Sequence, residues 1–200
     1  MTNRKRGRPS TIDENEVVDK TLKALWRRGF HATSMNDLAR EVGVSKPSLY
    51  NMVGDKNALL QRALTQYCGK NVGQVEAILK IESPVEFFRA YWQILIDGMC
   101  DDQLPDGCFL VQTTIECRDA ALKPFIEGLH ADTHKMIAAR LSEDLAQQRI
   151  RADVDLSTLA DFVGGQAFAL AVMSRAGADR TRLERFADQA AAALGRLCDA

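Results

Sequence analysis

Apolar residues recur at intervals of three and four positions along most of this chain of 200 residues, which is the period of one face of an α-helix. Glycines, prolines and short polar stretches divide this pattern into separate segments. The segments predict an all-α protein with about nine helices. In the first segment, over residues 13 to 28, Val18, Leu22 and Leu25 share one face, and Trp26 beside them is expected to anchor a small core.

Two short helical segments joined by a glycine turn follow directly. Ser34 is placed to cap the first of them, with Asp37 three positions later as its capping-box partner. Gly43 stands where a left-handed cap ends that helix, Ser45 can cap the next one, and Pro47 lies in its first turn, where its missing N–H costs nothing. Two helices with this spacing predict a helix-turn-helix, whose second helix enters the major groove of DNA.

An ordered set of residues runs through the same region: Gly29, Phe30, Thr33, Ser34, Asp37, Leu38, Ala39, Gly43, Val44, Ser45, Leu49, Tyr50 and Lys56. Over residues 13 to 64 the chain resembles the TetR family of transcriptional regulators. It departs from the family's pattern at Met52 and Val53, where a His-Phe pair is usual, and at Asn57, where Glu is common. The resemblance implies an N-terminal three-helix helix-turn-helix domain that binds DNA and a C-terminal helical domain for ligand binding and dimerisation.

The resemblance also implies a homodimeric, ligand-responsive regulator, most often a repressor, that binds a palindromic operator in double-stranded DNA and is released by a small-molecule effector. By analogy with the family, four residues would contact phosphates: Thr33, Ser34, Tyr50 and Lys56. At the start of the second motif helix, we expect the cap Ser45 to contact DNA and three residues to reach the edges of the bases: Lys46, Pro47 and Ser48.

The net charge of −1 conceals an asymmetry along the chain. Residues 1 to 60 carry 11 Lys and Arg against 7 Asp and Glu, whereas residues 61 to 200 carry 15 against 20. The pattern predicts a flexible basic arm over residues 1–12, a DNA-binding domain over 13–56, and an effector-binding and dimerisation domain over 57–200. The arm either enters an A·T-rich minor groove or adds nonspecific affinity as a solvated tail, through Arg4, Lys5, Arg6 and Arg8.

The sequence lacks the motifs that are typical of several other classes of protein. The sequence has no Gly-rich phosphate loop, nucleophile elbow or HExxH motif, so we expect no enzyme activity, no cofactor and no metal. His130 and His134 stand one turn apart, near Glu127, but an ordinary polar or pocket-lining role is favoured over a metal site. No stretch approaches the ~18 apolar residues of a membrane span. With five cysteines in no framework spacing, we expect a cytoplasmic protein with reduced thiols and no membrane partner.

The rest of the chain predicts a connecting helix from Asp55 and further helices after Ser83, after Cys108 and over residues 123 to 148. Polar residues inside the apolar segment after Cys108 must be satisfied, so they either bond neighbouring helices or line a cavity. The aromatic residues after Ser83 fill a core or line a pocket. Our candidates for contact with an effector are Phe88, Trp92, Cys108, Phe109, Gln112, Thr113, Glu116, His134 and Phe168.

The last two predicted helices are typical of a dimer interface. The first carries a stripe of large apolar residues and a second stripe of small ones, and a helix with two apolar stripes packs against two partners. The alternative is that both stripes pack within one protomer. Our candidates for the interface are Leu159, Val163, Ala167, Leu170, Leu183, Phe186, Ala190 and Leu197.

Two alternative functions are left open by the sequence. Cys108 follows a glycine at a predicted helix N-terminus, where the helix dipole favours a thiolate, so it is a candidate sensor of oxidants or electrophiles with Cys100 or Cys117 as its resolving partner. The other interpretation of Cys108 is a small buried apolar residue. A nonspecific DNA-organising protein that relies on the basic arm is the second alternative.

Overall fold

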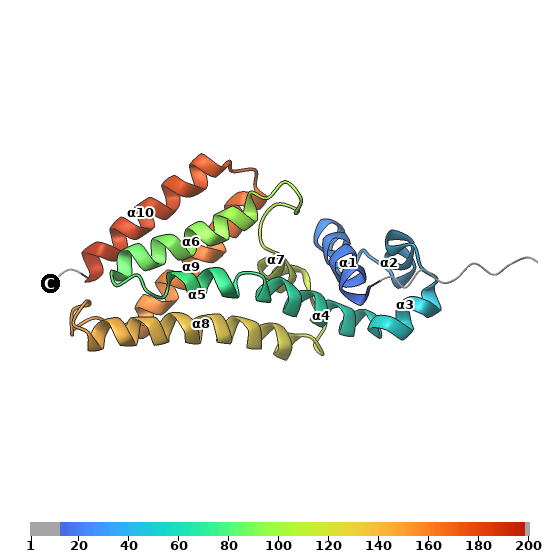
Figure 1. Cartoon of the computed structure of the whole chain (residues 1–200), viewed down its shortest axis with the longest axis horizontal. Helices are drawn as coiled ribbons and strands as arrows, with labels where there is room; N and C mark the ends of the chain where they lie inside the picture. The colour runs from blue at the N-terminus through green and yellow to red at the C-terminus, as the bar shows by residue number, and fades with distance from the viewer. Residues whose placement is uncertain (1–12, 199–200) are drawn as a thin grey trace, which may run out of the picture.

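The computed structural model describes residues 13–198, and within that range the chain folds into ten α-helices with no strand. The molecule is elongated, with a small head of three helices at one end and a larger helical body at the other (Figure 1). The predicted arm residues Arg4, Lys5, Arg6 and Arg8 lie outside the described residues. The helices are α1 (Glu14–Arg28), α2 (Met35–Val42), α3 (Lys46–Val53), α4 (Lys56–Gly69), α5 (Val72–Ile78), α6 (Pro84–Met99), α7 (Phe109–Glu116), α8 (Lys123–Ala146), α9 (Leu156–Arg175) and α10 (Arg180–Cys198).

Nine of these helices are the predicted ones, which confirms the all-α fold, and α5 is one more. Helix α5 is short and contains no buried residue. Only Val75 and Ile78 pack, half-buried, against the core of the body. Its apolar periodicity is therefore too weak to be recognised in the sequence.

The core of the head extends beyond its three helices. Trp26 on α1 is fully buried, with its ring centroid 5.2 Å from that of Tyr67 on α4 and 5.8 Å from that of Phe109 on α7. The same apolar cluster includes Leu59 and Leu64 of α4 and reaches Leu122 before α8. Helices α4 and α7 therefore connect the head to the body. A movement of either helix would change the packing around Trp26 of α1.

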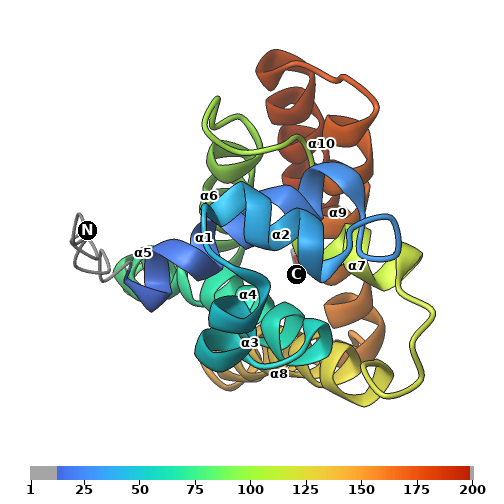
Figure 2. The same cartoon turned by 90° about the vertical axis from the view of Figure 1, so that its right-hand side faces the viewer.

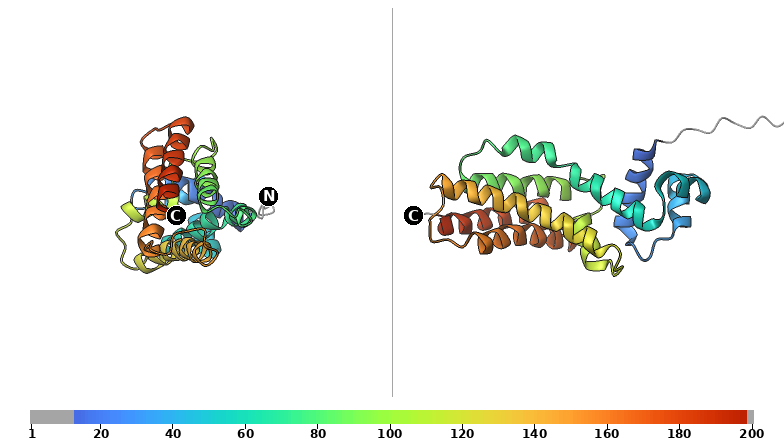
Figure 3. Two further views of the ribbon diagram at one scale, coloured as in Figure 1. Left: turned by 90° about the vertical axis from the view of Figure 1, so that its left-hand side faces the viewer. Right: turned by 90° about the horizontal axis from the view of Figure 1, so that it is seen from below.

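The body is a bundle built around α6, α8, α9 and α10, which run side by side (Figure 3). Its core contains Phe87, Phe88 and Trp92 of α6, all fully buried. The indole N–H of Trp92 donates a hydrogen bond of 3.3 Å to the backbone carbonyl of Val163 on α9. The aromatic residues after Ser83 are therefore core residues of the bundle.

A charged network is buried in the same bundle. Asp144 on α8 is fully buried and accepts hydrogen bonds from Arg140 Nε at 2.8 Å and from Arg149 Nη1 at 3.2 Å. Arg140, 6% exposed, also donates to the backbone carbonyls of Ile81 and Glu82 before α6. The network thus joins the C-terminal part of α8 to the segment between α5 and α6.

Helix α9 corrects one expectation from the sequence. It has a length and an apolar content that would suffice to cross a membrane, whereas we expected no such segment. In the structure α9 contacts α6, α8 and α10, as an apolar helix of a bundle does. Only 28% of its most apolar window is buried, however. Two large apolar side chains of α9, Phe168 and Val172, are exposed, and we call them the open apolar face of α9.

Candidate functional site

The local geometry of the helix-turn-helix agrees with its predicted caps. Ser34 accepts from the backbone N–H of Asp37, whose carboxylate accepts from the backbone N–H of Ser34 in return, which forms the capping box. Gly43 adopts the left-handed conformation, with φ 81° and ψ 28°, and ends α2. Ser45 caps α3 by accepting from the N–H of Ser48, and Pro47 occupies its first turn. Helices α2 and α3 are thus held in a fixed mutual orientation at the free end of the head (Figure 2).

The predicted contacts with bases lie on an accessible surface. Lys46, Pro47 and Ser48 are exposed at the first turn of α3, whereas Leu49, the next residue, is buried. Lys46 Nζ lies 5.9 Å from the centre of the Tyr50 ring, and Tyr50 is itself exposed. Among the phosphate candidates, Ser34 is also exposed, as is the cap Ser45. These six exposed side chains belong to α3, to its N-cap and to the N-cap of α2, at the free end of the head.

Two of the predicted phosphate contacts, Thr33 and Lys56, are not exposed. Thr33 is only 1% exposed, and its hydroxyl donates to the carbonyl of Gly29 at 2.8 Å. Lys56 is half-buried, with Nζ 4.1 Å from the centre of the Phe30 ring, and desolvation by burial lowers the pKa of its ammonium group. Both side chains are therefore engaged inside the head, and contact with a phosphate would require them to move.

One accessible residue was missed by the sequence analysis. Asn51 is exposed on α3, one turn after Pro47 and next to Tyr50. Its side-chain amide is of the kind that pairs with adenine in the major groove. The available signal was its helical register, since a residue four positions after Pro47 lies on the same face as Pro47.

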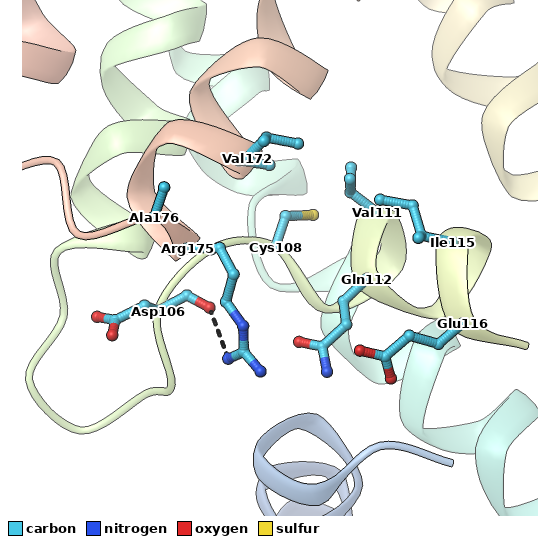
Figure 4. A pocket seen from close by; sticks show the side chains of 11 residues that line it. Asp106, Cys108, Val111, Gln112, Ile115, Glu116, Val172, Arg175 and Ala176 are labelled. Carbon is cyan, nitrogen blue, oxygen red and sulfur yellow. Dashed lines mark hydrogen bonds between the residues drawn. The ribbon is translucent and has the colours of Figure 1, made fainter. Parts of the chain in front are cut away.

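A pocket of about 360 Å³ lies in the body, between α7, the loop before it and the C-terminal end of α9 (Figure 4). Val111, Ile115 and Val172 form its apolar side. Three polar side chains lie on the opposite side, which faces α1: Gln112 and Glu116 from α7 and Arg175 from α9. The pocket is therefore amphipathic, with its polar side next to the head.

Three of the nine predicted effector-contacting residues line this pocket, namely Cys108, Gln112 and Glu116. The other six are elsewhere. Phe88, Trp92, Phe109 and Thr113 are buried in the two cores, and the hydroxyl of Thr113 donates to the carbonyl of Phe109 at 2.8 Å within its own helix. The remaining two, His134 and Phe168, lie on the exposed surface of α8 and α9. The sequence missed Arg175, because its neighbours in the pocket are distant in sequence.

Two residues of the pocket also contact the head. The side-chain N–H of Gln112 donates to the backbone carbonyl of Trp26 at 2.9 Å. The carboxylate of Glu116 lies against Gly29, the residue that ends α1, so closely that a Cβ at Gly29 would be 2.8 Å from Glu116 Oε2. The wall of the pocket is therefore in direct contact with the C-terminal end of α1.

Cys108 occupies the predicted position at the N-cap of α7. Cys108 influences the pKa of Cys68 on α4, a cysteine that the sequence analysis did not consider as its partner. Burial, followed by the charge of Cys108, raises the pKa of the Cys68 thiol to about 11. At neutral pH Cys68 is therefore protonated, which is the unreactive form of a thiol. A role for Cys108 as a sensor stays a prediction, and an unchanged response to oxidants in Cys108→Ser would contradict it.

The two histidines considered as metal ligands have other partners. One ring nitrogen of His130 lies 2.7 Å from the hydroxyl of Thr114, and the His130 ring stacks on Phe168 with centroids 5.1 Å apart. His134 Nε2 lies 3.3 Å from a carboxylate oxygen of Asp161 on α9. These contacts link α7, α8 and α9 along one side of the body.

The predicted dimer residues divide into two groups. Five of them are buried in the core of their own protomer. Three belong to the large apolar stripe of α9, which faces α6, α8 and α10, and two belong to α10: Leu159, Val163 and Leu170 of α9, and Leu183 and Ala190 of α10. Ala167 and Phe186 are half-buried, and Leu197 is exposed. The apolar residues that α9 leaves open are Phe168, 41% exposed, and Val172, 53% exposed. Ile115 of α7, 60% exposed, also lines the pocket with Val172.

Comparison with known proteins agrees with this division into head and body. A family model described as bacterial regulatory proteins, tetR family, matches residues 17–63, and one described as tetracyclin repressor-like, C-terminal domain, matches residues 84–190. The HTH-type transcriptional repressor ComR of Escherichia coli (strain K12) is 27% identical over 186 residues, which are 91% of this chain and 89% of ComR.

Solved structures show the same fold. A cysteine variant of the TetR family regulator CifR, complexed with 26-base-pair operator DNA, has a TM-score of 0.83 and 23% identity, and the match covers 93% of this chain and 99% of CifR. The regulator FadR from Bacillus subtilis, in complex with stearoyl-CoA, has a TM-score of 0.76 and 15% identity, over 91% of this chain and 97% of FadR.

The two family models cover both the helix-turn-helix and most of the body, in the order in which the structure places them. The first contains the capped helices α2 and α3, and the second contains the pocket between α7 and α9. This chain therefore belongs to the TetR family of bacterial regulatory proteins, and it is a DNA-binding regulator of transcription.

Proposed function

We propose that this protein is a cytoplasmic repressor that binds a palindromic operator as a homodimer and leaves it when a small molecule occupies the pocket between α7 and α9. The observation that carries the proposal is the position of Gln112, which lines the pocket and donates to the carbonyl of Trp26 in the head. A ligand that displaces Gln112 changes a contact of α1. Since α1 packs on α2 and α3, the change alters the position of the recognition helix.

Selection from random DNA duplexes tests the first part of the proposal. We expect the purified protein to enrich a palindrome and to bind it ~10³-fold or more tightly than a scrambled duplex at physiological salt. Equal and steeply salt-dependent binding to both duplexes would contradict the proposal and favour a nonspecific DNA-organising protein that acts through its basic arm.

The substitution Gln112→Leu tests the link between pocket and head. Leucine fills a similar volume but cannot donate to the carbonyl of Trp26. We expect the free protein to keep its affinity for the operator, while the effector-induced loss of affinity becomes about fivefold smaller, as the removal of one hydrogen bond of about 1 kcal/mol predicts. The measurement is fluorescence anisotropy of labelled operator, with and without the compound that gives the largest thermal shift in a screen of the free protein.

A matched control is Gln93→Leu, a glutamine on α6 that lies outside the pocket. It is expected to leave the response unchanged. An unaltered response in Gln112→Leu would show that the signal reaches the head by another route, such as α4.

The homodimer is supported by the open apolar face of α9. We expect Phe168→Glu to raise the dissociation constant of the dimer about 10- to 100-fold, because each protomer loses part of the burial of one aromatic ring and two carboxylates then approach across a two-fold axis. Analytical ultracentrifugation measures this shift. Ala139→Glu, a change at another exposed position, on α8, serves as the control. If Phe168→Glu remains fully dimeric, the dimer uses another face.

The open apolar face of α9 also borders the pocket. Ile115 and Val172 belong both to the pocket and to the exposed apolar surface. A second copy that docks on α9 would therefore cover part of the open side of the pocket and reduce the contact of a bound ligand with water.

A further inference from the structure

The polar side of the pocket carries two opposite charges that are not neutralised by each other. Arg175 Nη1 makes one long contact of 3.5 Å, with the backbone carbonyl of Asp106. Over residues 13–198, Arg175 forms no ion pair, and the carboxylate of Glu116 forms neither an ion pair nor a hydrogen bond. Both residues line the pocket. Other charged residues of the described chain, such as Lys46 and Lys80, also form no ion pair, but Arg175 and Glu116 share one wall of a pocket.

These charges flank an amide group. The side chains of Arg175, Gln112 and Glu116 end on the same side of the pocket, with Gln112 in the middle, while the carboxylate of Asp106 points away from them (Figure 4). The Nε2 group of Gln112 is already bonded to Trp26, and its Oε1 is buried with no hydrogen-bond partner among the described residues. A buried acceptor without a partner costs free energy, which a donor from a ligand would recover after a small rotation of this side chain.

The apolar side of the pocket indicates the chemistry of the rest of the ligand. Val111, Ile115 and Val172 offer aliphatic contact, and no charged side chain lies among them in the close view (Figure 4). A volume of about 360 Å³ is at the lower end of the range for small-molecule sites, so it suits a compact ligand. The ligand would then place its apolar body against these residues and its polar end toward α1.

We propose that the effector is a small zwitterion with an apolar body, of the chemical class of an apolar amino acid, whose anionic group binds Arg175 and whose ammonium group binds Glu116. This inference rests on the proposed function of the pocket. It explains why one wall carries both charges, since a simple anion would be repelled by Glu116 and a simple cation by Arg175. Because Glu116 lies against Gly29, a ligand that moves this carboxylate would change the packing at the C-terminal end of α1.

A matched set of probes tests the proposal. L-phenylalanine, 3-phenylpropanoate and 2-phenylethylamine share one apolar body, but the second lacks the ammonium group and the third lacks the carboxylate. The same three forms of leucine, isoleucine, valine, methionine and tryptophan complete the panel. Binding to the full-length protein is measured by thermal shift and calorimetry, without DNA. We expect at least one amino acid to bind about tenfold or more tightly than either of its two counterparts, as the loss of one charge-assisted hydrogen bond predicts.

Charge variants assign the two ends of the ligand. Arg175→Gln is expected to remove the advantage of the amino acid over the amine, and Glu116→Gln its advantage over the carboxylic acid. Arg151→Gln, an exposed arginine in the loop between α8 and α9 that pairs with Asp153, should change neither ratio. Loss of thermal stability in a variant is recognised from its melting temperature without ligand.

The proposal is overturned if no amino acid of the panel binds, if a carboxylic acid or an amine binds as tightly as its amino acid, or if both charge variants keep the wild-type ratios. Release of operator DNA is measured separately. Selective binding without release would support this inference and contradict the proposed mechanism of release. Release by a compound of another class, lost on substitution of Val111 by Trp to fill the pocket, would support the proposed function and contradict this inference.

Discussion

Replacement of Lys46 by alanine is expected to weaken binding to the selected operator about 30- to 10⁴-fold, because a good base contact contributes about 1–3 kcal/mol and a homodimer loses it in both half-sites. Lys46 is exposed in the first turn of α3, its ammonium group lies 5.9 Å from the centre of the Tyr50 ring, and among the described residues it forms no ion pair. Alanine is well tolerated in a helix, so the fold should be retained. Electrophoretic mobility shift at fixed salt, over a titration of protein, measures the change.

The salt dependence of binding shows which part of the DNA Lys46 contacts. A contact with a base leaves the slope of log affinity against log salt nearly unchanged and relaxes the preference at one base pair of each half-site. A contact with a phosphate weakens binding to every sequence alike and lowers the slope by about one per half-site. Lys80→Ala removes an equally exposed lysine between α5 and α6 and should have little effect. Equal operator affinities for Lys46→Ala and Lys80→Ala would exclude a role for Lys46 in recognition.

Replacement of Asp144 by alanine is expected to lower the free energy of unfolding by about 3–5 kcal/mol, because it leaves a buried guanidinium without its counter-charge. Asp144 is 0% exposed, and the Arg140 guanidinium beside it lies 4.1 Å above the ring of Phe87. Arg140 would keep its bonds to the carbonyls of Ile81 and Glu82, but these are neutral acceptors and do not neutralise the charge. Chemical denaturation at one fixed protein concentration measures the loss, since dimerisation contributes to stability.

Two further variants show whether the effect comes from the uncompensated charge. Asp153→Ala breaks an exposed ion pair with Arg151 and should change stability little. The double variant Arg140→Met with Asp144→Leu removes both charges together, and we expect it to recover most of the stability lost in Asp144→Ala. A double variant as unstable as the single one would mean that packing, and not charge, makes the network important.

The helix-turn-helix shows how much the sequence can predict. Each local interaction that defines the motif spans three or four residues: the capping box of Ser34 and Asp37, the left-handed cap at Gly43, and the cap of Ser45 on the N–H of Ser48. Interactions of this range are encoded by neighbouring residues and need no other part of the fold. For the same reason the observed caps of α2 and α3 agree with the prediction, whereas α5, which has no strong caps or apolar face of its own, was not predicted.

The effector pocket, in contrast, could not be predicted from the sequence. Its polar wall combines Gln112 and Glu116 of α7 with Arg175, which lies at the far end of α9, and no periodicity relates these positions. On α9 itself the sequence predicted two apolar stripes, but it could not predict that the larger residues, such as Val163 and Leu170, face inward while Phe168 and Val172 remain open. The all-α fold, the helix caps and the DNA-binding motif are thus determined by local sequence. The orientation of each helix, and with it the pocket, its contact with α1 and the exposed face of α9, is decided only when distant helices compete to bury apolar surface in one core.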